Sequence, residues 1–379
     1  MKFVFIVQGE GRGHMTQAIA FSKMLEQSGH QLAGVILGKS NRRSIPEFFS
    51  REINAPVHWI PSPNFETDKG EKGILIGKTI LSNLKKLPVY WGSLMLIHGI
   101  IQTEKPDVIL NFYDLLGGFY SFMFRPKSAY WVIGHQYLSS HPEFIYAPSI
   151  GFQKQLFQLN TWMTAWGADE RLALSFQPMK SHSVSKVRVV PPLLRPEVKE
   201  LGPIEGGFFL AYIVNCGYSE EVISFAKANP DSKIKVYWDK KEAAEIENPL
   251  PNLSFHRVHD KNFLEDMAAC KGLICTAGFE SICEAMYLGK PVMVIPVAGQ
   301  FEQACNALDV VAAGAGINSE SFDFGYFNQT LSKSKPVEKQ FKEWIQTWDV
   351  IFAQITAVEK KALEETISEG DFGEGSLSF

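Results

Sequence analysis

The chain has 379 residues, of which 45% are hydrophobic and 21% are charged, and its formal net charge is −4. This length suits two domains better than one hydrophobic core, and the composition is that of a globular protein rather than a disordered one. The slightly acidic balance argues against a general nucleic-acid-binding protein, so we expect no nucleic-acid partner.

The five cysteines form no C-x-x-C pair, and no Cys/His cluster has the spacing of zinc ligands. An odd number of scattered cysteines indicates reduced thiols rather than a disulfide framework. The N-terminal apolar run is too short for a signal peptide, and no run approaches the roughly 18 apolar residues of a membrane span. We therefore expect a cytoplasmic protein, with peripheral contact to the inner face of the cell membrane as an open alternative.

The first half of the chain alternates apolar strands with a helical pattern. Residues 3–7 (FVFIV) predict a buried strand, 14–30 a helix and 32–37 a second strand. Residues 106–114 and 129–134 predict further buried strands. A strand–helix–strand unit with a glycine-rich first turn is typical of a doubly wound parallel sheet.

A proline- and glycine-rich segment at 191–206 predicts a linker, which divides a first domain at 1–190 from a second at 207–330. The second domain repeats the alternation, with strands expected at 207–214, 233–238, 273–276 and 291–296 and helices at 219–229 and 279–289. We expect residues 331–379 to form helices that cross back to the first domain, followed by a loose polar tail.

The glycine-rich turn after the first strand has two interpretations. Gly9, Gly11 and Gly13 follow the pattern G-x-G-x-G, and His14 comes next. A dinucleotide fingerprint needs G-x-G-x-x-G and an acidic residue at the end of the second strand, and this chain has neither. We therefore favour the alternative, in which the glycines clear space beside His14, a histidine at a helix start that is well placed to abstract a proton.

A second group of polar residues follows the strand expected at 273–276. Gly278 and Ser281 lie at the start of the next helix, whose exposed N–H groups suit a diphosphate. Glu284 lies one turn further, where a carboxylate can accept hydrogen bonds from two ribose hydroxyls. After the next strand, Glu302 and Gln303 together supply acceptors and donors for sugar hydroxyls.

This second group resembles the nucleotide-sugar signature of GT-B glycosyltransferases, such as the peptidoglycan N-acetylglucosaminyltransferase and the plant UDP-glucosyltransferases. Their pattern is G-x-x-(S/T)-x-x-E, then G-x-P, then (D/E)-Q-x-x-N-A, and the chain has GFESICE at 278–284, GKP at 289–291 and EQACNA at 302–307. The resemblance implies an α/β protein of two Rossmann-like domains that face each other across a cleft. The first domain would hold the acceptor and the second the nucleotide-sugar donor.

The opening turn, GEGRGH at 9–14, resembles a matching turn of the same enzymes. By this resemblance His14 is the general base, and Gly11 and Gly13 leave room for donor and acceptor. An aspartate orients the histidine in the plant enzymes, and Asp114, in a similar segment, is the matching position. The alternative is that Asp114 only caps a helix.

By the same resemblance, Phe263 and Leu264 line the pocket of the uracil base, with core packing as the alternative. Thr276 stands where the plant enzymes place a phosphate-binding histidine, so its hydroxyl or the backbone would take that contact. Glu280 stands where the family often has Ser or Asn, and a carboxylate beside a diphosphate is unfavourable unless it points away. Arg12 and His135 are weaker candidates for the acceptor side.

Two absences bear on the expected reaction. No Asp-x-Asp metal motif occurs, so we expect no cofactor and no obligatory metal ion. Retaining GT-B enzymes carry a second glutamate eight positions before the one that matches Glu284, and that position here is Thr276. The resemblance therefore implies an inverting transfer from a UDP-sugar, such as UDP-N-acetylglucosamine, to a hydroxyl acceptor. A UDP-N-acetylglucosamine 2-epimerase and a non-catalytic nucleotide-sugar-binding subunit are the alternatives.

Residues 72–103 contain four lysines and no acidic residue, with apolar residues at helical spacing. Ile76, Ile80, Leu84 and Leu87 would share one helix face, with Trp91 nearby. One interpretation is a membrane-surface helix that serves a lipid-linked acceptor or an envelope glycan. The other is an ordinary amphipathic core helix.

Overall fold

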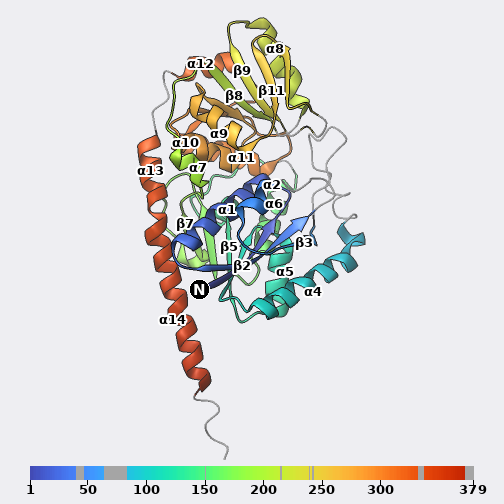
Figure 1. The fold of residues 1–379 in the computed structure, drawn as a ribbon, viewed down its shortest axis with the longest axis vertical. Coiled ribbons are helices and arrows are strands. Elements are labelled where there is room, and N and C mark those ends of the chain that lie inside the picture. The colour runs from blue at the N-terminus through green and yellow to red at the C-terminus, as the bar shows by residue number, and fades with distance from the viewer. Residues whose placement is uncertain are drawn as a thin grey trace, which may run out of the picture.

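The computed structural model describes residues 1–39, 47–63, 83–149, 151–213, 216–238, 240, 243–331 and 337–371. Two seven-stranded sheets organise these residues into an N-terminal and a C-terminal half (Figure 1). Apolar side chains on both faces of each sheet pack against helices. The predicted α/β class with two doubly wound sheets is confirmed.

The N-terminal sheet has the strand order β3-β2-β1-β4-β5-β6-β7, and all neighbouring strands are parallel. The strands are β1 (Lys2–Gln8), β2 (Gln31–Lys39), β3 (Val57–Pro61), β4 (Val108–Phe112), β5 (Ala129–Gly134), β6 (Glu170–Leu174) and β7 (Val187–Val190). The helices are α1 (Arg12–Gln27), α2 (Glu47–Glu52), α4 (Leu87–Glu104), α5 (Leu115–Phe124), α6 (Gln153–Thr164) and α7 (Pro196–Glu200), with short 3₁₀ helices at His135–Ser140 and Ser183–Ser185.

The run FVFIV is recognisable in the sequence because β1 is buried on both faces of the sheet. Phe3, Phe5 and Val7 enter the core on one face of the sheet, whereas Val4 and Ile6 enter the core on the other face. A parallel strand that is covered on both faces needs an apolar residue at every position.

The C-terminal sheet has the order β10-β11-β9-β8-β12-β13-β14, with β10 antiparallel to β11 and the other pairs parallel. The strands are β8 (Phe208–Ile213), β9 (Lys233–Trp238), β10 (Ile246–Leu250), β11 (Leu253–Arg257), β12 (Leu273–Cys275), β13 (Val292–Val294) and β14 (Gly316–Asn318). The helices are α8 (Ser219–Ala228), α9 (Asp260–Ala269), α10 (Phe279–Tyr287), α11 (Phe301–Ala312), α12 (Phe324–Leu331), α13 (Glu338–Gln346) and α14 (Trp348–Asp371), with a 3₁₀ turn at Cys216–Tyr218.

Each sheet changes the direction of its winding once, between β1 and β4 in the N-terminal half and between β8 and β12 in the C-terminal half. Ligands of doubly wound sheets bind at the carboxyl ends of the strands at such a point. The turn 9–14 follows β1, and Asp114 follows β4. Gly278 follows β12 in the other sheet. The topology therefore brings the residues singled out in the sequence to these two points.

The C-terminal helices α13 and α14 run alongside both halves of the molecule (Figure 1). The indole N–H of Trp344 donates to the Ser175 carbonyl at 3.0 Å, and that of Trp348 donates to the Pro192 carbonyl at 3.1 Å. Phe352 of α14 packs edge-on against Phe21 of α1, with ring centroids 5.5 Å apart. These contacts hold α13 and the first turns of α14 against the N-terminal half.

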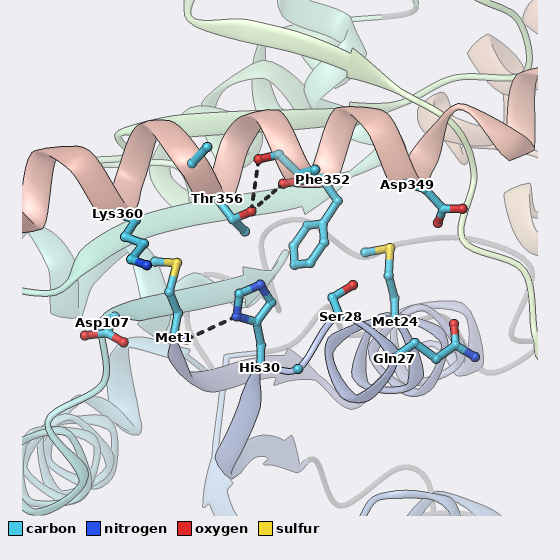
Figure 2. A pocket seen from close by; sticks show the side chains of 13 residues that line it. Met1, Met24, Gln27, Ser28, His30, Asp107, Asp349, Phe352, Thr356 and Lys360 are labelled. Carbon is cyan, nitrogen blue, oxygen red and sulfur yellow. Dashed lines mark hydrogen bonds between the residues drawn. The ribbon is translucent and has the colours of Figure 1, made fainter.

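A groove of about 890 Å³ lies between α14, the start of β1 and the end of α1 (Figure 2). His30 points toward α14, with its Nδ1 atom 3.1 Å from the terminal amine of Met1 and its ring 5.5 Å from that of Phe352. This groove is at the amino end of β1, so it is separate from the glycine-rich turn at the carboxyl end.

The helix α4 packs one face into the core, as the core-helix interpretation expects, and leaves apolar residues exposed on the other face. Its inner face packs into the core through Tyr90, Leu94, Ile97 and Ile101. Its outer face leaves Leu87, Trp91 and Met95 exposed, with Leu87 at 57% and Trp91 at 52%, and Leu84, which precedes the helix, is also exposed. Ile76 and Ile80 lie outside the described residues. Along the parts of the chain that the structure covers, no helix is both long and apolar enough to span a bilayer.

Candidate active site

A cavity of about 290 Å³ lies between the two halves of the molecule. The walls come from the start of α1, the segment after β5, the starts of α9 and α10, and Arg195 before α7. The sequence-predicted residues that line it are Gly11, Arg12, Gly13, His14, His135, Phe263, Gly278, Ser281, Glu284 and Glu302. The cavity wall also includes polar residues that were not predicted from the sequence, among them Thr16, Gln17, Gln136, Arg195 and Asp260.

Two helix N-termini converge on this cavity. The helix α1 begins after Gly11 and α10 begins after Gly278, and neither helix has a side-chain cap hydrogen bond. The first-turn N–H groups of a helix need partners from outside the helix and carry partial positive charge. Just before α10, Thr276 is buried behind the cavity and is not part of its wall, and its hydroxyl has no hydrogen-bond partner among the residues described. This wall is suited to an anion with several oxygen atoms.

His14 presents a neutral imidazole to the cavity. Its Nδ1 atom lies 3.3 Å from Oε1 of Gln17, and its ring stacks on Tyr113 with centroids 5.7 Å apart. Because an amide oxygen can only accept, Nδ1 carries the hydrogen and Nε2 is the bare nitrogen. Burial lowers the pKa of His14 to about 4, so the ring is uncharged at neutral pH.

Asp114 does not orient His14, and this part of the prediction is wrong. Its Oδ1 atom accepts the backbone N–H of Leu116 at 2.8 Å and caps α5, while Oδ2 accepts the Ser62 hydroxyl at 2.8 Å. The preceding Tyr113 has a left-handed φ of 61°, and its ring is the group that packs against His14. The helix-cap alternative for Asp114 is therefore confirmed.

Glu280 lines the cavity instead of pointing away from it. Its Oε1 atom accepts a hydrogen bond from Nε2 of Gln17 at 2.5 Å, and Oε2 is buried without a partner among the described residues. Burial, reinforced by the nearby charge of Glu284, raises the pKa of Glu280 to about 8. The side chain is therefore mostly protonated and uncharged at neutral pH, which removes most of the repulsion expected between a carboxylate and a diphosphate.

Glu284 is held by a residue that the sequence analysis missed. Its Oε1 atom accepts from Nε of Arg195 at 2.7 Å. The Nη1 atoms of Arg195 and Arg12 lie 4.0 and 3.9 Å from the same oxygen of Asp260. Arg195 is the one charged residue in the run PPLLRP, and this is the only signal for it in the sequence. Two guanidinium groups thus approach the starts of α9 and α10.

The predicted sugar-binding pair is only half present in the cavity. Glu302 lines the cavity, and its Oε1 atom accepts from Nε2 of Gln136 at 2.9 Å. Burial raises the pKa of Glu302 to about 7. The expectation for Gln303 is not met, because its Oε1 atom accepts the backbone N–H of Val297 at 2.8 Å and the residue is not part of the cavity wall.

The remaining candidates divide between the cavity and the core. His135 donates from Nδ1 to the Leu174 carbonyl at 2.8 Å and stacks on Phe279 at 4.2 Å, so it joins the two halves. Phe263 lines the cavity and also packs in the apolar core. Leu264 is buried in the apolar core, so for this residue the core alternative is correct and the base-pocket expectation is wrong. Over the ranges that the structure covers, no group of three or more His, Cys, Asp or Glu residues is arranged to hold a metal ion.

Solved structures of glycosyltransferases share this architecture. The glycotransferase of kitacinnamycin superposes with a TM-score of 0.60 at 14% identity, over 93% of this chain and 98% of that protein. UGT2 of Phytolacca americana, complexed with UDP-2-fluoro-glucose and pterostilbene, gives 0.58 at 12% identity over 97% and 99%. A UGT transferase from Siraitia grosvenorii in complex with UDP gives 0.57 at 13% over 91% and 94%. Identities this low establish the fold alone.

The sequence itself is recognised at the level of a family. No curated protein matches the chain at a significant level. The family described as glycosyl transferase family 1 matches residues 1–333, which include both sheets and every residue of the cavity wall. The chain therefore belongs to glycosyl transferase family 1 and is a glycosyltransferase of the GT-B fold.

Proposed function

We propose that this glycosyltransferase is an inverting, metal-independent enzyme that moves a sugar from a UDP-sugar, such as UDP-N-acetylglucosamine, to a hydroxyl acceptor. One observation carries the proposal: His14, with Nε2 bare, shares a cavity with the uncapped N-terminus of α10. A base and an anion-binding wall in one cavity are what glycosyl transfer from a diphosphate donor requires.

The proposed reaction is a single displacement. The acceptor hydroxyl gives its proton to Nε2 of His14, and the acceptor oxygen forms a bond to the anomeric carbon. The bond between that carbon and the diphosphate oxygen breaks on the opposite face, and its electrons leave with the nucleotide. The starts of α1 and α10, with Arg12 and Arg195, stabilise the negative charge of the leaving group. Inversion is supported by Thr276, which puts a hydroxyl where a retaining enzyme would have glutamate.

The donor is proposed to lie with its nucleotide along α9 and α10. Phe263 and the adjacent Tyr212, with ring centroids 5.5 Å apart, supply an aromatic wall for a base. Glu284 lies next to this wall and suits ribose hydroxyls, and Glu302 with Gln136 suits the sugar. The choice of uridine is supported by the UDP ligands of the Phytolacca and Siraitia enzymes. Metal independence rests on the lack of an Asp-x-Asp motif.

A thermal-shift panel tests the choice of donor. At about 100 times its dissociation constant, a ligand of the native state stabilises it by about 2.7 kcal/mol, which corresponds to roughly 3 °C for a protein of this size. We expect UDP and UDP-N-acetylglucosamine to raise the melting temperature by this amount, and ADP and GDP to raise it by much less. Uridine is the control for the contribution of the diphosphate. A panel in which no nucleotide shifts the transition would contradict the proposal.

We further propose that the acceptor is lipid-linked and that the enzyme works at the inner face of the cell membrane. The exposed face of α4 is continuous with α5, because Trp91 contacts the ring of Phe124 at 6.4 Å. Phe122 and Met123 of α5 are also exposed. Four exposed basic residues flank this apolar face, namely Lys85, Lys86, Arg125 and Lys127. An apolar face with a basic rim is complementary to an anionic lipid surface.

The variant W91E/M95E tests this surface. We expect its binding to vesicles of phosphatidylglycerol and phosphatidylcholine to fall at least about tenfold, because two apolar side chains no longer enter the lipid and two negative charges are added. Vesicle co-sedimentation measures the effect. V184E is the matched control, since Val184 is 88% exposed and lies outside this face. Equal vesicle binding by the wild type and W91E/M95E would exclude this face as the contact.

A further inference from the structure

We propose that Gln17 and Glu280 together position His14, so that the base is oriented only when the two halves of the molecule meet. Gln17 belongs to α1 in the N-terminal half, and Glu280 belongs to α10 in the C-terminal half. The inference rests on the proposed role of His14 as the base. It assigns to an amide and a carboxyl group the orienting function that the sequence analysis gave to Asp114.

The geometry is a continuous chain of two hydrogen bonds. Gln17 follows His14 by three residues, so both side chains lie on one face of α1. Its Oε1 atom is 3.3 Å from Nδ1 of His14, and its Nε2 atom is 2.5 Å from Oε1 of Glu280. Gln17 is nearly completely buried. Breaking these hydrogen bonds would destabilise the folded state, because the buried amide would have no other partner.

The direction of these two hydrogen bonds determines the tautomer of the His14 imidazole. The Gln17 amide donates from nitrogen to Glu280, so its oxygen is the group that faces His14. This oxygen can only accept, and it therefore selects the His14 tautomer with hydrogen on Nδ1. The bare Nε2 is then the atom that takes a proton from the acceptor. The partner of one ring nitrogen fixes the role of the other.

The packing of α1 against α10 is adapted to this arrangement. A Cβ atom at Gly13 would lie 3.1 Å from Cγ of Glu280, which is closer than most Cβ contacts in proteins. The glycine therefore allows Glu280 to come close enough to reach Gln17. The need for a glycine at position 13 is therefore explained by the contact with Glu280, whereas the sequence suggested that it leaves room for the substrates.

Glu280 also links these hydrogen bonds to the side of the cavity where the donor is proposed to bind. Its Oε2 atom is buried and lacks a partner among the described residues, and Glu280 lines the same cavity as Ser281 and Glu284. In the protonated state this oxygen is a hydrogen-bond donor that a diphosphate or sugar oxygen can accept. One carboxyl group would then contact the donor with one oxygen and hold the base through the other.

Substitutions of Gln17 test the proposal by their effect on kcat. Q17L keeps the approximate size but removes both hydrogen bonds, and we expect kcat for UDP release from UDP-N-acetylglucosamine, with water as acceptor, to fall about a hundredfold. The KM for the donor should stay within about threefold, since Gln17 is not expected to contact it. Q27L is the matched control, because Gln27 is an exposed residue at the other end of α1.

The conservative variant Q17E distinguishes positioning from a merely structural role. Its carboxylate accepts from Nδ1 of His14, and the protonated Glu280 can donate to it, so activity should recover to within about tenfold of the wild type. The added negative charge should raise the pKa of His14 and move the acid limb of the kcat profile upward by roughly 1–3 pH units. The other ionisable groups that line this cavity or contact His14 are Glu284, Arg195, Tyr113, Glu302, His135 and the Arg12–Asp260 pair, and they are the same in both proteins.

The tautomer of His14 can also be measured directly by NMR, without an activity assay, in variants of Gln17 and of Glu280. With ¹⁵N-labelled histidine, the His14 signal, assigned by its loss in H14A, should report the Nδ1–H tautomer in the wild type and a mixture in Q17L. E280L should show the same mixture, whereas E280Q, which keeps an acceptor for Gln17, should retain the single tautomer.

The outcomes separate this inference from the proposed function. If H14A is inactive but Q17L and E280L keep wild-type kcat and a single His14 tautomer, the positioning role is wrong and the base stands. If H14A itself is fully active, the proposed function fails first. Should Q17L be too unstable to measure, an unshifted pH limb in Q17E would overturn the positioning role.

Discussion

Replacing His14 with alanine should reduce UDP release from UDP-N-acetylglucosamine about a thousandfold and leave UDP binding nearly unchanged. A positioned general base contributes about 10² to 10⁴ in rate, and His14 presents its bare Nε2 in the cavity on which the starts of α1 and α10 converge. The imidazole should contribute little to nucleotide affinity, because it is uncharged and, in the proposed reaction, contacts the acceptor hydroxyl. Coupled detection of UDP measures the rate, and isothermal titration with UDP measures the binding.

The control for this experiment is H182A. His182 hydrogen-bonds to the hydroxyl of Ser185 and does not line the cavity, so its loss should leave the rate within about twofold of the wild type. A normal rate in H14A would show that His14 is not the base. Loss of both rate and UDP binding in H14A would instead indicate that His14 supports the donor site.

Replacing Arg195 with leucine should have the largest effect on stability. Glu284 is only 3% exposed, and its Oε1 atom would lose the Arg195 partner at 2.7 Å. Removing one partner of a buried ion pair costs about 3–5 kcal/mol, because the other charge stays buried without compensation. We expect a decrease of this size in the free energy of unfolding by urea. UDP binding should also weaken by roughly tenfold or more, since a guanidinium beside the diphosphate is lost.

The double variant R195L/E284L separates the two effects. Removing both charges should restore much of the stability, because no buried carboxylate is left unpaired. UDP affinity should remain low, since neither the guanidinium nor the carboxylate is present to bind the donor. If R195L alone is as stable as the wild type and binds UDP equally well, Arg195 has neither function.

The strands at the centre of both sheets could be predicted because each is buried on two faces. The apolar runs of β1, β4, β5, β8, β9, β12 and β13 are visible for this reason. Six strands were missed, namely β3, β6, β7, β10, β11 and β14. They lie at the sheet edges or next to an edge strand, and they are short or carry polar, charged, glycine or proline residues. The strand–glycine–helix segments around His14 and Gly278 were also visible, because each combines a short-range turn with a helix start.

The hydrogen-bond partners at the site could not be predicted in the same way. Asp114 was expected on His14 because of a local motif, but the left-handed backbone at Tyr113 and the hydroxyl of Ser62 decide where its carboxylate lies. Leu264 follows Phe263 directly on α9, and both side chains belong to the apolar core, but the orientation of the helix lets only Phe263 also line the cavity. Such choices depend on contacts between segments far apart in the chain.

The sequence by itself determined the fold class, the family and the two turns where the chemistry lies, because each of these is encoded over a few consecutive residues. Only the tertiary structure decided that Gln17 meets Glu280, which is 263 positions away, and that Arg195 meets Glu284, 89 positions away. The physical reason is that a polar side chain in a cavity between two halves takes its partner from whichever element packs against it. That packing is a property of the whole core and not of any short segment.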